Sequence, residues 1–309
     1  MITTYKRIWN DIEELYRFLN SLDVNASFRS HLEHDYLTAS VFVEKYYCGR
    51  DTELTAEGRS AIGGLHELYK WIWSVKDCAE FNKLIPHLQM LSESATRINS
   101  TTPMINPVTK KQDDKSNKLI ETIVAMYAIK IGKDVTIDDP VVSSGGSNPD
   151  VMFSYQGKKI AFACKTLRGK SGNTVCDNLR SAAKQIAVAD CDAGYIAINA
   201  MNILPHKKIS QTKFNNHLEP LSILTNYIDT LYGELKKNSS ADLAKIFSNA
   251  KVRPVILTLV HSNTRLSTCL GDVSTMLKKT HPTEMIDGMA TDDDISILSD
   301  VNKFIHNRL

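Results

Sequence analysis

The sequence predicts an α/β protein in which a mixed β-sheet flanked by helices follows a segment made of helices alone. Three observations support this prediction. Apolar residues recur at helical spacing through roughly the first 98 residues. A polar, proline-containing stretch at 97–115 then interrupts the periodicity. From residue 116 onward, short apolar runs alternate with amphipathic helices, an order typical of sheets with parallel or mixed pairing.

The N-terminal part is expected to form four helices. Apolar side chains recur at three- and four-residue intervals along the first helix, which precedes residue 23. The second helix covers 35–47, and the third follows Thr55, a residue type that suits an N-cap. The fourth covers 79–91 and is bent or restarted at Pro86. No catalytic pattern occurs here, so we interpret this part as a module for oligomerisation, partner docking or target sensing.

The stretch 97–115 has the composition of a linker. It contains two prolines, is rich in polar residues and shows no periodicity. We therefore place a domain boundary near residue 105. This divides the chain into a helical domain at 1–104 and a second domain at 105–309.

The second domain is expected to open with a helix at 116–131 and a strand at 135–142. The serine- and glycine-rich loop that follows is either a plain connection or a backbone that approaches a phosphate closely. A β-hairpin comes next, and Gly157 in its two-residue turn supplies the positive φ that a tight hairpin requires. Because side chains alternate across a strand, 163 and 165 share one face and Cys164 lies on the other.

The remainder of the chain completes the sheet and its covering helices. The elements expected after the hairpin are a helix at 178–190, a strand at 193–200, helices at 221–237 and 241–250, a strand at 252–261, and helices at 262–279 and 294–308. Three successive aspartates at 292–294 are interpreted as helix-capping residues, because neighbours at a helix start do not face one another.

Composition describes a globular protein and argues against several other classes. The 309 residues are 42% hydrophobic and 23% charged, and a net charge of +2 does not by itself indicate a nucleic-acid partner. Six cysteines form no CxxC pair, which argues against a zinc knuckle and a disulfide framework. The amphipathic start does not resemble a signal peptide, and no apolar run reaches the ~20 residues of a membrane span. We therefore expect a cytoplasmic protein without membrane contact.

Positive charge is concentrated around the hairpin. Residues 151–176 contain no Asp or Glu, and their cations are Lys158, Lys159, Lys165, Arg168 and Lys170. Two interpretations stay open. The segment complements the charge of a DNA backbone, or the lysines protect a solvated hairpin edge from aggregation.

The motif that indicates a function lies at the same hairpin. Pro149 and Asp150 precede the first strand, and the second strand contains the letters FACK at 162–165. A Pro-Asp pair followed on the next strand by a lysine resembles the PD-(D/E)xK nuclease superfamily, which has the restriction-endonuclease-like fold. The resemblance covers about residues 115 to 262. It implies that Asp150 binds one or two divalent cations, Mg²⁺ or Mn²⁺, and that Lys165 orients or activates the attacking water.

Position 163 departs from the pattern of this superfamily. The resemblance implies a Glu, Asp or sometimes Gln two residues before Lys165, where this chain has Ala163. An alanine cannot ligate Mg²⁺, and the loss of one of two carboxylates weakens a hard-cation site. Ala163 is either the mark of a naturally degenerate nuclease or a replacement that inactivates a catalytic glutamate, and the intact surroundings favour the replacement.

The resemblance implies roles for further residues. Glu121 would add a carboxylate to the metal site, the Cys164 carbonyl would be another ligand, and Gln185 would reach the active site. The residues expected to contact DNA are Lys158, Lys159, Arg168, Lys170 and Lys184. Simpler interpretations stay open: Glu121 complements a helix dipole, and Lys184 and Gln185 belong to a solvated helix face.

The function implied is that of a Mg²⁺-dependent DNA endonuclease in restriction or anti-phage defence. It would act as a homo-oligomer or beside a separate ATPase or sensor protein. Ala163 would leave little or no cleavage, with DNA binding retained. The alternative is a non-catalytic DNA-binding or regulatory protein on a degenerate nuclease fold, and an RNA-directed nuclease is a third hypothesis.

Overall fold

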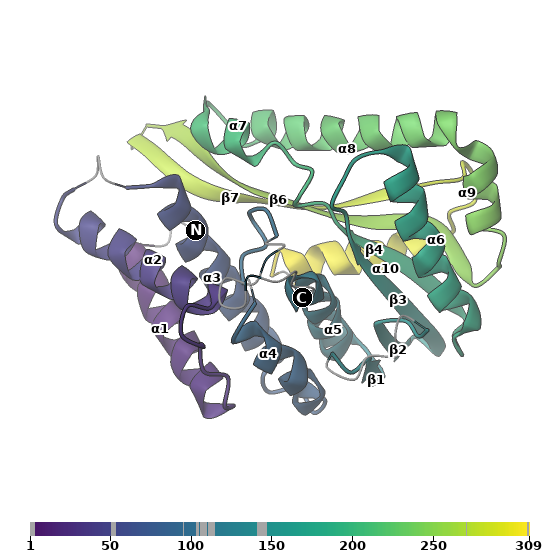
Figure 1. Ribbon diagram of the computed structural model, residues 1–309, viewed down its shortest axis with the longest axis horizontal. Coiled ribbons are helices and arrows are strands. Elements are labelled where there is room, and N and C mark those ends of the chain that lie inside the picture. The colour runs from purple at the N-terminus through teal and green to yellow at the C-terminus, as the bar shows by residue number, and fades with distance from the viewer. Residues whose placement is uncertain are drawn as a thin grey trace.

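In the part of the chain that the structure describes, seven strands form one mixed sheet with helices on both faces (Figure 1). The computed structural model describes residues 4–50, 54–94, 96–102, 105, 110, 115–140, 147–269, 271–307 and 309. The α/β class with a mixed, helix-flanked sheet is therefore confirmed. None of the helices in these ranges is long and apolar enough to cross a membrane.

The sheet combines both kinds of strand pairing. Its order is β1-β2-β3-β4-β6-β5, and β7 pairs with β6 outside this path. The β1–β2, β2–β3 and β6–β7 pairs are antiparallel, and the other pairs are parallel. The strands are β1 Lys133–Ile137, β2 Val151–Tyr155, β3 Lys158–Thr166, β4 Ala193–Asn199, β5 Lys213–Phe214, β6 Val252–Thr268 and β7 Gly271–Glu284.

Helices precede, connect and follow the strands. The α-helices are α1 Tyr5–Ser21, α2 His31–Tyr47, α3 Ala56–Val75, α4 Ile85–Leu91, α5 Lys118–Ile131, α6 Gly172–Val188, α7 His206–Gln211, α8 Leu218–Asn238, α9 Ser240–Ile246 and α10 Asp292–Ile305. Two short 3-10 helices, η2 Phe81–Leu84 and η3 Lys115–Asn117, lead into α4 and α5.

Different helices cover the two faces of the sheet. Phe162 and Cys164 of β3 pack into the core that contains α5 and α10. Ala161 and Ala163 pack into the core that contains α6, α8 and α9. The alternation expected along β3 is therefore confirmed, with Cys164 facing away from the side that carries Ala163.

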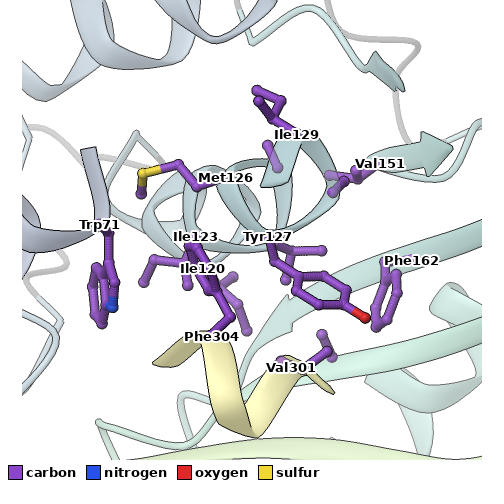
Figure 2. Close-up of a cluster of buried hydrophobic side chains, with 14 of the residues drawn as sticks. Trp71, Ile120, Ile123, Met126, Tyr127, Ile129, Val151, Phe162, Val301 and Phe304 are labelled. Atoms are coloured by element: carbon purple, nitrogen blue, oxygen red, sulfur yellow. The ribbon is translucent and has the colours of Figure 1, made fainter. Parts of the chain in front are cut away.

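The N-terminal helices share a hydrophobic core with the sheet. Trp71 of α3, Ile120 of α5 and Phe304 of α10 belong to one buried cluster, and Figure 2 shows Trp71 on one side of α5 and Phe162 on the other. The Trp71 indole nitrogen also donates to the carbonyl of Ile305 at 3.4 Å. A smaller cluster is formed by α1, α2 and α3 alone. The predicted boundary near 105 thus does not divide two separate cores; 103–104, 106–109 and 111–114 lie outside the described residues.

Several local signals act as the sequence predicts. Thr55 caps α3 by accepting a hydrogen bond from the backbone of Gly58 at 3.0 Å. Thr291 and Asp294 form a reciprocal capping box at the start of α10, which confirms the capping interpretation for Asp294. Pro86 lies in the first turn of α4, directly after η2, as expected for a restarted helix.

The predicted hairpin is also confirmed. Gln156 and Gly157 have φ angles of 49° and 79°, and two successive positive φ angles are the mark of a type I′ turn. This turn joins β2 to β3 with Tyr155 opposite Lys158. The strand predicted at 135–142 corresponds to β1. The last two positions of the predicted range, 141 and 142, and the serine- and glycine-rich loop at 143–146 lie outside the described residues.

The helix predicted at 262–279 is wrong, because residues 262–268 and 271–279 belong to strands. β6 continues to Thr268, and β7 returns beside it in continuous antiparallel register. The segment contains three threonines and one valine, and β-branched residues suit an extended backbone. Side chains of β7 alternate between helix layers: Leu277 packs into the core with α8, and Thr280 donates to Asn302 of α10 at 2.7 Å. The elements α7 and β5 were not predicted.

The shared core predicts that the described helices and sheet unfold together. Trp71→Ala removes a side chain that is 1% exposed, so we expect a loss of about 3 to 5 kcal/mol in the free energy of unfolding. Chemical denaturation followed by far-UV circular dichroism should show one transition at a lower midpoint. Ile295→Ala, at a side chain 62% exposed, is the control and should change stability by less than about 0.5 kcal/mol. Separate transitions for helices and sheet would contradict the shared core.

Candidate active site

A cavity of about 460 Å³ lies where β2 begins and β3 ends, between α5 and α6. Polar and charged side chains dominate its lining. The carboxylates are Glu121, Asp138 and Asp150, the cations are Lys118, Lys165 and Arg168, and the other residues are Asn117, Cys164, Thr166, Thr174, Asn178 and Gln185. Charged groups of both signs therefore meet at one end of the hairpin, at the place where the sequence predicts a site.

Asp150 is held in place by backbone groups of β3. Its Oδ2 accepts a hydrogen bond from the Cys164 N–H at 2.6 Å, and its own N–H donates to the Phe162 carbonyl at 3.0 Å. Asp150 is thus bonded to both residues that flank Ala163. Burial and the nearby charge of Glu121 raise the pKa of Asp150 to about 7, although Lys165 and the Cys164 N–H act to lower it.

Glu121 enters the cavity from the first turn of α5. Its side chain is buried, and its Oε2 accepts a hydrogen bond from Lys118 Nζ at 2.7 Å. His87 of α4 lies behind it, with Nε2 3.8 Å from the same oxygen. Burial, the largest single effect, acts to lower the pKa of Lys118, but the charge and hydrogen bond of Glu121 together with the charges of Asp150 and Asp138 outweigh it, and the pKa is raised. Lys118 is therefore a cation next to this carboxylate.

Lys165 is oriented by α6. Its Nζ donates to Gln185 Oε1 at 2.5 Å, while Gln185 Nε2 donates to the carbonyl of Asn148 at 2.8 Å. Gln185 is only 3% exposed, so its orientation is fixed by these two bonds. The structure thus brings Asp150, Lys165, Glu121 and Gln185 to one cavity, and the alternative of a solvated Gln185 is wrong because its side chain is buried.

The residues between Phe162 and Lys165 contribute in different ways. Ala163 is buried among side chains of the α6 layer, does not line the cavity and offers no ligand atom. Cys164 lines the cavity, but burial raises the pKa of its thiol well above the ordinary value, so the sulfur stays protonated. The carbonyl of Cys164 is the group that the family resemblance implies as a ligand.

The residues present do not complete a metal site. Two buried carboxylates, Asp150 and Glu121, share the cavity, and the closeness of their charges would favour a cation. No group of three His, Cys, Asp or Glu side chains that could hold an ion occurs among the described residues, although Asp138 lines the same cavity. Lys118 is bonded to Glu121, and position 163 supplies an alanine methyl group.

The lysines expected to contact DNA lie in different places, and two of them lie far from the cavity. Lys158 and Lys159 begin β3, which places them roughly 20 Å along the strand from Lys165. They form ion pairs with Asp293 and Asp190 respectively. Strand direction alone therefore separates them from the cavity.

Of the other cations expected to contact DNA, one lines the cavity and two are exposed to solvent outside it. Arg168 follows β3 and lines the cavity. Lys170 and Lys184 are exposed and are not part of the lining. Only Arg168, of the five residues in this group, thus shares the cavity with Asp150.

Some cavity residues were not found from the sequence. Lys118 precedes Glu121 by three positions, which places both on one helix face, and this spacing was an available signal. Thr174 and Asn178 precede Gln185 on α6 by eleven and seven residues, so they lie on the face that carries Gln185. Asp138 follows β1, and its N–H donates to the Asp150 carbonyl at 2.9 Å. No sequence signal connects Asp138 with Asp150, because their pairing depends on the β1–β2 contact.

Comparisons of the chain with protein-family models, with curated proteins and with solved structures find no match.

The buried Asp150 predicts a specific pH dependence of stability. Its pKa in the folded state, about 7, lies above the ordinary value of 3.8, so the stability it contributes is fully present below about pH 4 and is lost as pH rises through about 7. Asp150→Asn removes this titration while its side-chain oxygen can still accept the bond from Cys164. We expect equal stability of the two proteins near pH 4 and a variant more stable by about 2 to 4 kcal/mol at pH 8.

Denaturant titrations across this pH range would measure the effect. Asp138→Asn is the matched control, since Asp138 lines the same cavity but is only partly buried. If the difference in the free energy of unfolding between wild type and Asp150→Asn stayed constant from pH 4 to pH 8, the Asp150 carboxylate would not titrate as stated.

Proposed function

We propose that this chain is a DNA-binding protein with a nuclease site of the PD-(D/E)xK type, on a restriction-endonuclease-like fold. With alanine at 163, it cleaves DNA weakly or not at all. The observation that carries this proposal is the meeting of Asp150, Glu121 and Lys165, from the start of β2, from α5 and from β3, at one cavity. These three residues occupy the positions that the family resemblance assigns to two carboxylates and the lysine.

The order of elements around the cavity supports the same proposal. A helix, α5, precedes an antiparallel β1–β2–β3 meander, and α6 then connects β3 to a parallel neighbour, β4. A hairpin followed by a helix and a further strand is the context that strengthens a short, degenerate motif. The acidic and basic residues lie at the end of the hairpin remote from its turn.

Charge balance explains why the alanine form suits binding better than cleavage. Lys118, Lys165 and Arg168 line the cavity, and the raised pKa of Asp150 leaves that carboxyl partly protonated near pH 7. The cavity can therefore accept an anionic phosphate without strong repulsion. A further carboxylate at 163 would make the cavity more negative, which is the condition that favours a hard divalent cation such as Mg²⁺ or Mn²⁺.

The chain's own residues suggest how phosphodiester hydrolysis would be assisted. The Lys165 ammonium is held by Gln185, so it can stabilise negative charge that develops on a phosphate in the cavity. Asp150 is fixed by two backbone bonds and would meet the reacting centre with little reorganisation. A divalent cation, where bound, would supply electrostatic stabilisation of the phosphate.

The second candidate is a non-catalytic DNA-binding or regulatory protein on the same fold. It is favoured by Ala163 and by the Lys118–Glu121 bond, which gives Glu121 a cationic partner without any metal. Both candidates include DNA binding and differ in whether restoring the carboxylate restores cleavage. A role in restriction or anti-phage defence, with a separate ATPase or sensor protein, belongs to the first candidate.

Restoring a carboxylate at 163 separates the two candidates. Because Asp150 is bonded to both neighbours of position 163, the side chain of Ala163→Glu would start beside the Asp150 carboxylate. We expect Ala163→Glu to nick supercoiled plasmid in Mg²⁺ or Mn²⁺ and the alanine protein to remain at background. Gel assays of nicking, with circular dichroism to verify folding, would measure this.

Two control variants make the nicking result specific. Ala163→Gln has nearly the same shape without the charge, and Ala163→Glu combined with Asp150→Ala lacks the partner carboxylate; both should show much less nicking. A folded Ala163→Glu protein that is as inert as the alanine protein would favour the non-catalytic candidate.

The placement of the cations predicts a contrast in DNA affinity. Arg168→Ala removes a positive charge from the cavity lining, and we expect about 3- to 10-fold weaker binding of a fluorescent duplex at low salt. The double variant Lys158→Ala and Lys159→Ala is the control, because these lysines lie at the other end of β3 in ion pairs. Fluorescence anisotropy would measure both. Equal weakening by the control would move the binding surface away from the cavity.

A further inference from the structure

A lysine begins α5, where the local rules of helix formation do not favour one. Lys118 is the first residue of α5, and the positive end of the helix dipole lies there. Glu121 follows three positions later, and a lysine that precedes its glutamate is the less favourable order for such a pair. The two side chains nevertheless form an ion pair, with Lys118 Nζ 2.7 Å from Glu121 Oε2. The reason for this lysine therefore lies in the cavity that both residues line.

The Lys118 ammonium lies near carboxylates from three places in the fold. Glu121 of α5, Asp138 after β1 and Asp150 before β2 all line the cavity with it. Burial acts to lower the pKa of Lys118, but the bond from Glu121 and the charges of all three carboxylates raise it. The ammonium is thus within the electrostatic reach of all three. The Lys118 side chain is only 21% exposed, so water screens these charges weakly.

Glu121 depends on Lys118 to compensate its charge. The glutamate is 5% exposed, and a buried carboxylate without a partner is costly. His87 Nε2 lies 3.8 Å from Glu121 Oε2, which is beyond hydrogen-bond distance. Neither ring nitrogen of His87 has a hydrogen-bond partner in the described part of the chain, so this buried ring packs behind Glu121 without bonding to it. Over the residues that the structure describes, Lys118 is therefore the donor that holds Glu121.

Lys165 has a different kind of partner. Its ammonium bonds to the amide oxygen of Gln185, which is neutral, so this bond leaves the positive charge of Lys165 available to an anion. Arg168 brings another cation to the lining of the same cavity. The two lysines therefore differ in role: Lys118 compensates carboxylates, whereas Lys165 can attract a phosphate.

We propose that the Lys118 ammonium occupies the position that the family resemblance assigns to a divalent cation, beside Glu121 and Asp150. As the chain stands, the cavity then binds the phosphate of a DNA strand through Lys165 and Arg168 without a metal ion. A divalent cation would have to displace the ammonium, because two cations held this close repel each other. The inference rests on the proposed function, since it takes the cavity to be a DNA-binding site, and it adds which group supplies the cation.

The same assignment explains why carboxylates line the cavity without forming a metal centre. Among the described residues, no three His, Cys, Asp or Glu side chains are placed to hold an ion. A lysine ammonium donates up to three hydrogen bonds and needs no fixed ligand geometry, so it can compensate carboxylates in this arrangement. Ala163→Glu would add the charge that lets a divalent cation compete with Lys118.

Mn²⁺ binding by the full chain tests the assignment without any DNA or activity. In Lys118→Met the buried carboxylates lose their compensating charge, and Mn²⁺ can replace it while it keeps several water ligands. We expect Lys118→Met to bind Mn²⁺ at least about tenfold more tightly than wild type. Electron paramagnetic resonance of the free ion would measure this. Lys118→Arg retains the positive charge and should bind Mn²⁺ no more tightly than wild type.

Two controls make the Mn²⁺ result specific. Lys130→Met removes a positive charge near the other end of α5, where the ammonium bonds the Ser74 carbonyl at 3.2 Å, and should leave Mn²⁺ binding at the wild-type level. Lys118→Met combined with Glu121→Gln lacks the carboxylate and should lose the gain. Circular dichroism verifies folding. Thermal denaturation is the second measurement if Lys118→Met is unstable, because bound Mn²⁺ should raise its midpoint and not that of wild type.

DNA binding gives a test that begins with the wild-type chain. Wild type should bind a fluorescent duplex with the same affinity, within about twofold, in EDTA and in Mn²⁺ at matched ionic strength. Lys118→Met leaves uncompensated carboxylates that repel phosphate, so we expect about 3- to 10-fold weaker binding in EDTA and recovery in Mn²⁺. Arg168→Ala should not recover in Mn²⁺, because it removes a cation that the assignment gives to the phosphate.

Three results would overturn the assignment. Wild type could bind Mn²⁺ as tightly as Lys118→Met, or it could require Mn²⁺ to bind the duplex. Lys118→Arg could gain as much Mn²⁺ affinity as Lys118→Met, which would show that the charge at 118 does not matter. Failure of the proposed function has a different signature: neither the wild type nor Ala163→Glu would bind or nick DNA, while the contrast in Mn²⁺ affinity between Lys118→Met and Lys118→Arg would remain.

Discussion

The burial of α5 on every side is the constraint on which the rest of the structure depends. Eleven of its fourteen residues are buried, and a helix that is apolar all round has to be enclosed by other elements. Here α3, α4, α10 and the β2–β3 part of the sheet enclose it. Removing the N-terminal helices would expose this core to water. The same enclosure holds Glu121, in the first turn of α5, at the cavity.

The N-terminal half also supports the cavity through its contacts with β1. Glu80 accepts a hydrogen bond from the Val135 N–H at 2.8 Å, and Lys83 donates to the Val135 carbonyl at 2.7 Å. These bonds cover an edge strand of the sheet with a helical segment. β1 in turn positions Asp138, whose N–H bonds the carbonyl of Asp150. The helical part is therefore structurally joined to the candidate site.

The electrostatics of the cavity follow from the way its carboxylates are buried. Asp150 has backbone partners that fix its position, but they do not fully offset the cost of burial and the charge of Glu121, so its pKa is raised. Lys118 of α5 and Lys165 of β3 compensate part of this negative charge. A site with this balance is poised between binding an anion and binding a cation. In the function proposed above, the residue at 163, next to Asp150, would decide which of the two is favoured.

The sequence by itself determined the elements whose signals are local. The helix cap at Thr55, the type I′ turn at Gly157 and the alternation along β3 each depend on a few neighbouring residues, so the hairpin and the order of Asp150 and Lys165 were predictable. Only the tertiary structure decided that 262–268 and 271–279 form strands, because pairing of β7 with β6 outweighs local helical spacing. It also decided that Lys158 and Lys159 lie away from the cavity, whereas Lys118, Asp138 and Thr174 lie within it. These positions depend on contacts between residues far apart in the chain, which no local pattern of side chains encodes.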